Sequence, residues 1–128
     1  RGMPTHIHHG SYRHREGYKG AIALLQEGVT ALIAGDSMMT AGALEACHNA
    51  GKRIGEEIAL VGFDDFIYLR FQPSPISVVD QDVARMGETA TAKLITAIND
   101  KHQPEGEVLE TRYIPRMSTA HQLDGATP

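Results

Sequence analysis

Residues 58–65 read IALVGFDD, so that six mostly apolar residues run directly into two aspartates. A short apolar run of this kind is typical of a strand that is buried on both faces. A second run, VTALIA at residues 29–34, is flanked by glycines and leads into Asp36. Apolar residues at helical spacing separate the two runs, and this alternation predicts an α/β fold with a parallel sheet flanked by helices.

The rest of the chain continues the alternation. A helix before Gly28 is indicated by apolar residues at helical spacing, and a second helix begins at Ser37, with the serine hydroxyl as its N-cap. In full, we expect helices at 12–27, 37–51 and 82–99, one or two helical turns at 66–71, strands at 29–34, 58–63, 76–79 and 108–114, and a disordered tail after Thr119.

Composition limits the class of protein. The 128 residues include 12 Lys+Arg and 16 Asp+Glu, a formal charge of −4, and 41% are hydrophobic, as expected for a single globular domain. No apolar run is long enough to span a membrane, and no signal peptide is evident. The single cysteine, Cys47, cannot form an internal disulfide, which favours the cytoplasm. The acidic charge argues against a nucleic-acid-binding module.

Ligands of parallel α/β sheets bind outside the carboxyl ends of the strands. This rule nominates Asp36, the pair Asp64 and Asp65, and the loop with Tyr12 and His14. The aspartate pair allows three interpretations: an acid–base or metal site, a capping residue beside a solvated one, or a carboxylate that accepts hydrogen bonds from a small polyol. In the third, Tyr12 stacks on the apolar face of the ligand. Binding without chemistry fits these residues better than catalysis does.

Other groups of residues that could catalyse a reaction or bind a metal ion have little support in the sequence. His6 and His8 share a face of an extended segment, but no Cys or carboxylate lies at a ligand spacing from them. Cys47 and His48 are adjacent on a helix, so their side chains point about 100° apart. The sequence has no GxGxxG, GxxxxGK[ST] or GxSxG motif. We therefore expect no metal, no cofactor and no enzyme activity.

Four motifs in order resemble the LacI/GalR family of bacterial transcription regulators. AGDSMMTAGAL (34–44) is similar to the family's xND.MA.GAL, and IGEEIALVGFDD (54–65) to its IPEDIALVGFDD. SPISVVDQD (74–82) resembles PPLTTV.QP, and IPRMST (114–119) resembles the terminal L..R.ST. The resemblance covers residues 10–119 and implies the latter half of an effector-binding domain with a periplasmic binding protein-like I fold.

The resemblance also implies which residues bind the effector. Asp64 matches a residue that hydrogen-bonds effector hydroxyls or base nitrogens. Asp36 stands where the family has an asparagine that often contacts the effector, and Gln81 lies near the crossover between subdomains. His14 stands three residues before the glycine of the helix start, where the family often has an effector-binding arginine. The expected effector site comprises Asp64, Asp36, His14, Tyr12 and Gln81.

The family's architecture implies a division of the chain. Residues 1–80 resemble the C-terminal subdomain of the effector-binding domain, and residues 81–119 resemble the crossover helix and strand that complete it next to the N-terminal subdomain. Residues 120–128 are the disordered tail, and the DNA-binding headpiece is absent.

Family dimers meet partly through this subdomain. Residues 66–71 are unusually apolar for a free surface, which independently favours an interface; burial within the monomer is the alternative. The expected interface comprises Met38, Ala41, Glu45, Phe66, Tyr68 and Phe71.

These features predict the effector-sensing and dimerisation portion of a cytoplasmic LacI-type transcriptional regulator. The expected partners are a small-molecule effector (a sugar or nucleobase-like metabolite), a second copy of the chain, and operator DNA only through the absent headpiece. No membrane contact is expected. The alternative function is that of a periplasmic sugar-binding protein of a transport system.

Overall fold

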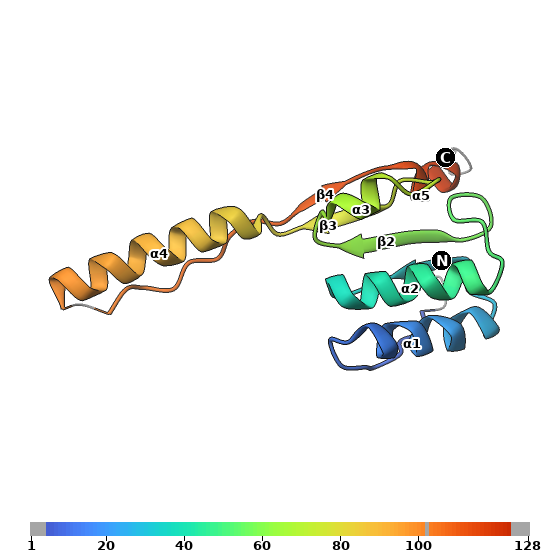
Figure 1. The fold of residues 1–128 in the computed structure, drawn as a ribbon, viewed down its shortest axis with the longest axis horizontal. Helices are drawn as coiled ribbons and strands as arrows, with labels where there is room; N and C mark the ends of the chain where they lie inside the picture. Colours follow the sequence, from blue (N-terminus) through green and yellow to red (C-terminus); the bar gives the residue numbers. More distant parts are fainter. Residues whose placement is uncertain (1–4, 102, 124–128) are drawn as a thin grey trace.

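The computed structural model describes residues 5–101 and 103–123, and a four-stranded sheet forms its centre. The predicted parallel sheet is confirmed for three strands, whereas the fourth strand pairs antiparallel with its neighbour. The reversal arises because the chain leaves the third strand through a long helix and then returns along the same path (Figure 1). In sheet order the strands are β1 (Ala31–Ile33), β2 (Ala59–Phe63), β3 (Ser77–Asp80) and β4 (Arg112–Ile114).

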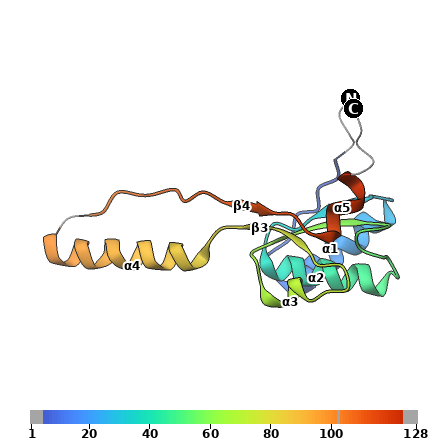
Figure 2. The ribbon, with the colours of Figure 1, turned by 90° about the horizontal axis from the view of Figure 1, so that it is seen from above.

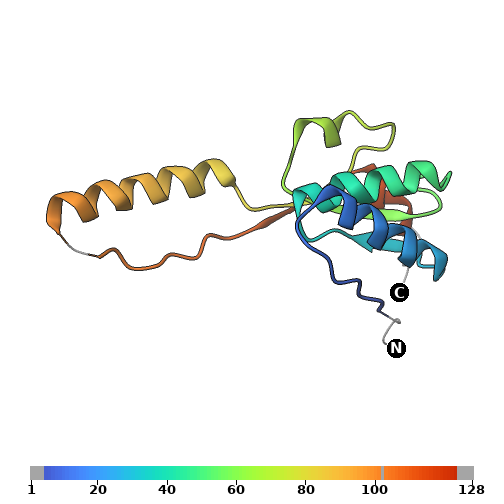
Figure 3. The same ribbon diagram turned by 60° about the horizontal axis from the view of Figure 1, so that its bottom comes forward.

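Two helices lie side by side against one face of the sheet, α1 (His14–Gln26) and α2 (Ser37–Asn49), as Figures 1 and 3 show. Their close approach depends on glycine, because a Cβ on Gly17 would lie 2.5 Å from the Cα of Met39. The core lies between these helices and the sheet. Its buried members are Ala21, Leu32, Ala43, Ala46, Cys47, Ile58, Leu60, Leu69, Ile76 and Val78.

Two shorter helices complete the body of the molecule. The expected helical turn at 66–71 is α3 (Ile67–Arg70), and α5 (Met117–Leu123) lies on the opposite side of the sheet from α2 and α3 (Figure 2). The Ser118 hydroxyl joins β2 to β3, since it donates to the carbonyl of Leu60 at 2.6 Å and accepts from the N–H of Ser77 at 2.8 Å. Beyond this anchor α5 continues to Leu123, whereas a disordered tail was predicted after Thr119. That prediction is wrong for residues 120–123, and residues 124–128 lie outside the described part of the chain.

The predicted helix at 82–99 is α4 (Val83–Asp100), which projects away from the sheet beyond the end of β3 (Figures 1 and 2). None of its residues is buried, although its apolar side chains follow a helical stripe. Leu94 and Ile98 are 60% and 67% exposed. Lys93 holds the returning chain beside the helix by bonding the carbonyl of Glu105 and the carboxylate of Glu107.

No helix in the described ranges is both long enough and apolar enough to cross a membrane.

Candidate functional site

The carboxyl ends of β1, β2 and β3 bring three of the predicted effector residues into one row. The pairing of Ile33 with Val61 places Asp36 and Asp64 three residues beyond a matched pair. Gln81 follows β3 directly. Neighbouring strands of a sheet lie about 4.8 Å apart, so Asp36, Asp64 and Gln81 occupy adjacent positions at one edge. We call these three residues the edge row.

Asp36 is the N-cap of α2. One carboxylate oxygen, Oδ1, accepts hydrogen bonds from the backbone N–H groups of Met38 at 2.8 Å and Met39 at 3.2 Å. The expectation that Ser37 caps this helix is therefore wrong by one residue. Asp36 has the extended backbone of a cap, with φ −158° and ψ 157°, whereas Ser37 is already in the helix. The cap fixes one oxygen and thereby orients the carboxylate at the edge.

Thr40 ties the start of α2 to the end of β2. Its hydroxyl donates to the carbonyl of Asp36 at 2.8 Å and accepts from the N–H of Phe63 at 2.9 Å. Thr40 is fully buried, and Gly62 makes room for it, because a Cβ there would lie 2.5 Å from the threonine methyl. This one side chain sets the spacing between the backbones that carry Asp36 and Asp64.

Asp64 and Gln81 contact one another. Gln81 donates from Nε2 to Oδ1 of Asp64 at 2.9 Å, and both residues are half-buried. The Asp64 backbone has φ +62°, in the left-handed region, where aspartate is tolerated better than most residues. Its N–H donates to the carbonyl of Val79 at 2.9 Å, which continues the β2–β3 ladder to the edge. The structure thus joins Asp64 and Gln81, as a shared ligand site requires.

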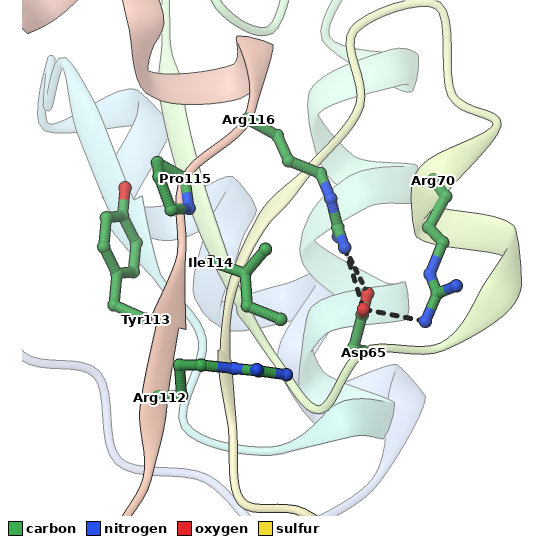
Figure 4. A pocket seen from close by; sticks show the side chains of 7 residues that line it. All are labelled: Asp65, Arg70, Arg112, Tyr113, Ile114, Pro115 and Arg116. Carbon is green, nitrogen blue, oxygen red and sulfur yellow. Dashed lines mark hydrogen bonds and ion pairs between the residues drawn. The ribbon is translucent and has the colours of Figure 1, made fainter.

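Asp65 has a different role from its neighbour. Its side chain is 12% exposed and is held by Arg116 at 2.7 Å and Arg70 at 2.8 Å (Figure 4). Burial alone would raise the pKa of Asp65, but the hydrogen bonds from Arg116 and Arg70 outweigh it and hold the pKa below its ordinary value. The two arginines give Asp65 a structural role, so the two members of the aspartate pair differ in environment.

Arg116 also donates to the carbonyl of Ile76 at 2.8 Å, so it connects the end of β2 with the start of β3. Asp65, Arg70 and Arg116 line a shallow pocket of about 440 Å³ together with β4 residues (Figure 4). A second cavity of about 640 Å³ lies between residues 5–8, α1 and β1. Neither cavity includes a residue of the edge row.

The other two predicted effector residues, Tyr12 and His14, precede α2 in the chain, and within the described residues no hydrogen bond joins them to the edge row. The loop before α1 lies at the same end of the sheet as the start of α2 (Figure 1), and Tyr12 in that loop is 78% exposed. His14 instead contacts Glu45 in the middle of α2, with Nε2 2.9 Å from Oε2. The structure therefore joins a predicted effector residue to a predicted interface residue.

The predicted dimer residues are exposed except for Ala41, which is partly buried. Phe66 and Phe71 are 47% and 79% exposed, and Leu69 is the residue of this segment that the core buries. Burial of the segment within the monomer, the alternative, is thus wrong for Phe66 and Phe71. Partial burial and the charge of Asp36 raise the pKa of Tyr68. Sequence reasoning did not connect Tyr68 with Asp36.

Two other chemically reactive side chains, those of Cys47 and His6, are buried or paired within the fold. Cys47 is fully buried, and burial raises the pKa of its thiol to about 11, which disfavours the thiolate that a nucleophile needs. His6 pairs with Glu27 on α1. Among the described residues, no group of three His, Cys, Asp or Glu side chains is placed to hold a metal ion.

Residues 3–119 match the model of the periplasmic binding protein-like domain. The chain belongs to this family. A curated relative, the HTH-type transcriptional regulator MalR of Streptomyces coelicolor, is 30% identical over 115 residues, which are 89% of this chain and 33% of that regulator. The matched relatives and structures are LacI-family regulators, so the LacI/GalR resemblance and the predicted fold class are confirmed.

Solved structures agree with this assignment. A probable LacI family transcriptional regulator from Corynebacterium glutamicum is 38% identical, with a TM-score of 0.75, and the match covers 85% of this chain and 39% of that one. The transcriptional regulator CelR, solved with cellobiose, is 28% identical with a TM-score of 0.76; 85% of this chain and 34% of CelR are covered. This chain spans about a third of the length of the curated relatives it matches.

Proposed function

We propose that this chain is the effector-sensing and dimerisation part of a LacI-type transcriptional regulator. A sugar, or a similar small metabolite such as a nucleobase-like one, binds at the edge row and controls operator binding by a helix-turn-helix headpiece outside this chain. The observation that carries the proposal is the edge row itself. Asp36, Asp64 and Gln81 converge at the carboxyl ends of three parallel strands, where α/β folds bind ligands.

The chemistry of the row supports a hydroxyl-rich effector. Carboxylates accept hydrogen bonds from hydroxyl groups, and the amide of Gln81 can both donate and accept. Tyr12 and His14, which lie on the loop and helix start at this end of the sheet, remain predicted contributors. CelR, a relative by fold and sequence, was solved with a sugar, cellobiose. The matched relatives are regulators, which favours this function over transport, favours binding over enzyme activity, and leads us to assign the protein to the cytoplasm.

We infer that the edge row is one wall of a cleft between two subdomains. Residues 1–80 belong to the C-terminal subdomain in this proposal, and residues 81–119 supply the crossover helix and strand next to the N-terminal one. The exposed apolar stripe of α4 supports this division, because a long amphipathic helix ordinarily buries that stripe. The stripe includes Val83, Met86, Leu94, Ile95 and Ile98. Gln81 leads from β3 towards α4, so the edge row lies at the end of the sheet from which α4 projects, where the second wall would close over the effector.

Dimerisation is assigned to the surface of α2 and α3. Phe66 and Phe71 are exposed aromatic residues on one segment, and Met38 on α2 is 49% exposed. Interfaces are enriched in aromatic residues and methionine. Tyr68 stands on the same segment, and its pKa is raised by partial burial and by the charge of Asp36, so effector binding and subunit contact would be linked through this residue. Such an arrangement couples two sites through one structural element.

A DNA-shift assay tests the proposed function on the whole protein, meaning this chain with any segment that precedes it. Operator fragments would first be selected from a random-sequence DNA library and then titrated with the protein, with and without cellobiose, lactose and related sugars. The proposal predicts sequence-specific retardation that at least one small metabolite increases or abolishes. An Asp64→Asn variant should lose that response, and a matched Asp100→Asn variant on exposed α4 should keep it. Absence of sequence-specific binding would refute the regulator assignment.

A further inference from the structure

We propose that the shallow pocket beside Asp65 binds a phosphate group, either as inorganic phosphate or on a small phosphate ester. This site is separate from the edge row, since no residue of the row lines the pocket. Three arginines reach it from different parts of the chain: Arg70 on α3, Arg112 in β4 and Arg116 after β4. Asp65 is the one carboxylate among the described residues that line it.

The charges of the lining residues do not balance. Arg116 and Asp65 form a mostly buried pair at 2.7 Å, so these two charges offset one another. Arg70 brings a second positive charge to the same carboxylate, at 2.8 Å. Arg112 brings a third, and its contact at 3.5 Å is with Asp80, which does not line the pocket. Three positive charges and one negative charge leave a net +2, or +1 with Asp80 counted, and this excess attracts an anion.

The three guanidinium groups also have N–H donors to spare. Each arginine side chain carries five such donors. The Arg70 side chain donates to Asp65, Arg116 donates to Asp65 and to the carbonyl of Ile76, and Arg112 reaches Asp80 only at 3.5 Å. No other side-chain hydrogen bond from these arginines occurs within the described part of the chain. Several N–H groups are therefore free to bind the oxygen atoms of a ligand.

The arrangement of the arginines favours phosphate over a carboxylate. Arg112 and Ile114 are alternate residues of β4 and point to the same side of the strand, towards the space where Arg116 and Arg70 meet Asp65 (Figure 4). Arg116 is mostly buried and fixed by its partners, whereas Arg70 and Arg112 are exposed and can turn towards a ligand. A phosphate group presents oxygens in several directions and so can bind more than one guanidinium, whereas a carboxylate has two oxygens in one plane.

The size of the pocket allows a ligand larger than the phosphate group alone. Its volume of about 440 Å³ lies in the range of small-molecule sites. Ile114 and Pro115 supply an apolar part of its lining, on which the carbon atoms of a small ester can rest. Inorganic phosphate and a phosphate ester therefore share the arginines and differ in their contact with this apolar part.

Calorimetric titration of the whole protein with inorganic phosphate and with glycerol 3-phosphate tests the proposal, at constant ionic strength and with glycerol as the neutral comparison. We expect saturable binding of phosphate and no binding of glycerol; tighter binding of the ester would identify a phosphorylated metabolite as the ligand, and tighter binding of inorganic phosphate the free ion. Arg70→Gln and Arg112→Gln should each weaken binding by about tenfold, because each removes charged donors. Both side chains are exposed, so circular dichroism should show that the variants fold. Arg53→Gln is the matched control, since Arg53 is exposed, pairs with Glu57 and lies outside the pocket, and it should bind like the unmodified protein.

Three results would overturn the proposal. The first is that neither phosphate compound binds saturably. The second is that Arg53→Gln weakens binding as much as Arg112→Gln does, which would show an effect of total charge alone. The third concerns Arg85, which is exposed in the first turn of α4, four residues after Gln81. If Arg85→Gln abolishes phosphate binding while Arg70→Gln and Arg112→Gln keep it, the anion binds near the edge row and not in this pocket.

Discussion

The body of the molecule and its projecting arm contain helices in opposite environments. In the body, which comprises residues 5–80 with β4 and α5, α2 buries Ala46 and Cys47 completely. In the arm, which comprises α4 and the returning chain up to residue 111, no helical residue is buried. Periodicity thus predicts that a helix forms and which stripe is apolar, but it does not reveal what covers the stripe.

This contrast locates the candidate site at a boundary. The edge row lies where the body ends and the arm begins, since Gln81 is the link between β3 and the cap of α4. The body holds the row in place through Thr40 and the Asp65–Arg116 pair. The arm contributes no described hydrogen bond to Asp36 or Asp64. We interpret the body as the preformed half of the binding site and the arm as the connection to the other half.

The largest effect is expected from matched leucine truncations. Leu60 on β2 is fully buried, so Leu60→Ala should lower the free energy of unfolding by about 2–5 kcal/mol. Leu94 on α4 is 60% exposed, and Leu94→Ala in the 128-residue chain should cost less than about 0.5 kcal/mol. Urea unfolding monitored by circular dichroism measures both. Equal losses of unfolding free energy would show that Leu94 is packed in this chain, contrary to the contrast between the body and the arm.

A smaller difference in unfolding free energy is expected between substitutions of two arginines. Arg116 is 16% exposed and lies 2.7 Å from Asp65, whereas Arg112 at the base of the arm is 75% exposed and lies 3.5 Å from Asp80. Arg116→Met leaves a mostly buried carboxylate with one partner fewer and should cost about 2–4 kcal/mol in unfolding free energy. Arg112→Met should cost at most about 0.5 kcal/mol, because exposed ion pairs contribute little. The reverse order in urea unfolding would contradict the structural role assigned to Asp65.

The ion pair of Asp65 with Arg116 should also make stability depend on pH, with a smaller effect on unfolding free energy. The pKa of Asp65 is lower in the folded chain than its ordinary value, so the unfolded chain binds more protons as acid is added. The contribution of Asp65 is therefore complete above about pH 4 and is lost as pH falls through the folded pKa.

Urea unfolding at pH 7, 5 and 3 measures this loss. In Asp65→Asn that part of the acid sensitivity should disappear, whereas the exposed Asp100→Asn should retain it. An Asp65→Asn variant that is as acid-sensitive as the unmodified chain would refute the assignment.

Much of this fold is predictable from local patterns. The strand IALVGF and the helix after Asp36 follow from apolar runs, helical spacing and cap residues, and their order predicts the carboxyl edge on which Asp36 and Asp64 lie. The antiparallel β4 was not predictable in this way, because the direction of a strand depends on the path of α4 rather than on residues 112–114.

The contacts of the site residues also differ in whether local patterns predict them. Asp64 and Gln81 could be paired from their places after neighbouring strands, whereas the His14–Glu45 contact depends on how α1 crosses α2. The different roles of Asp64 and Asp65 could be recognised only from the contacts of Asp65 with Arg70 and Arg116. These arginines lie 5 and 51 residues away from Asp65 in sequence. Contacts over such distances are set by the tertiary fold.

The central claim is that Asp64 binds the effector directly, and titration calorimetry of Asp64→Asn in the whole protein tests it most directly. With the sugar that binds most tightly among cellobiose, lactose and related sugars, the substitution should weaken binding by about 1.5–3 kcal/mol, the value of a hydrogen bond to a charged group. The Asp100→Asn control should bind like the unmodified protein. An unchanged affinity in Asp64→Asn would remove Asp64 from the site and contradict the account.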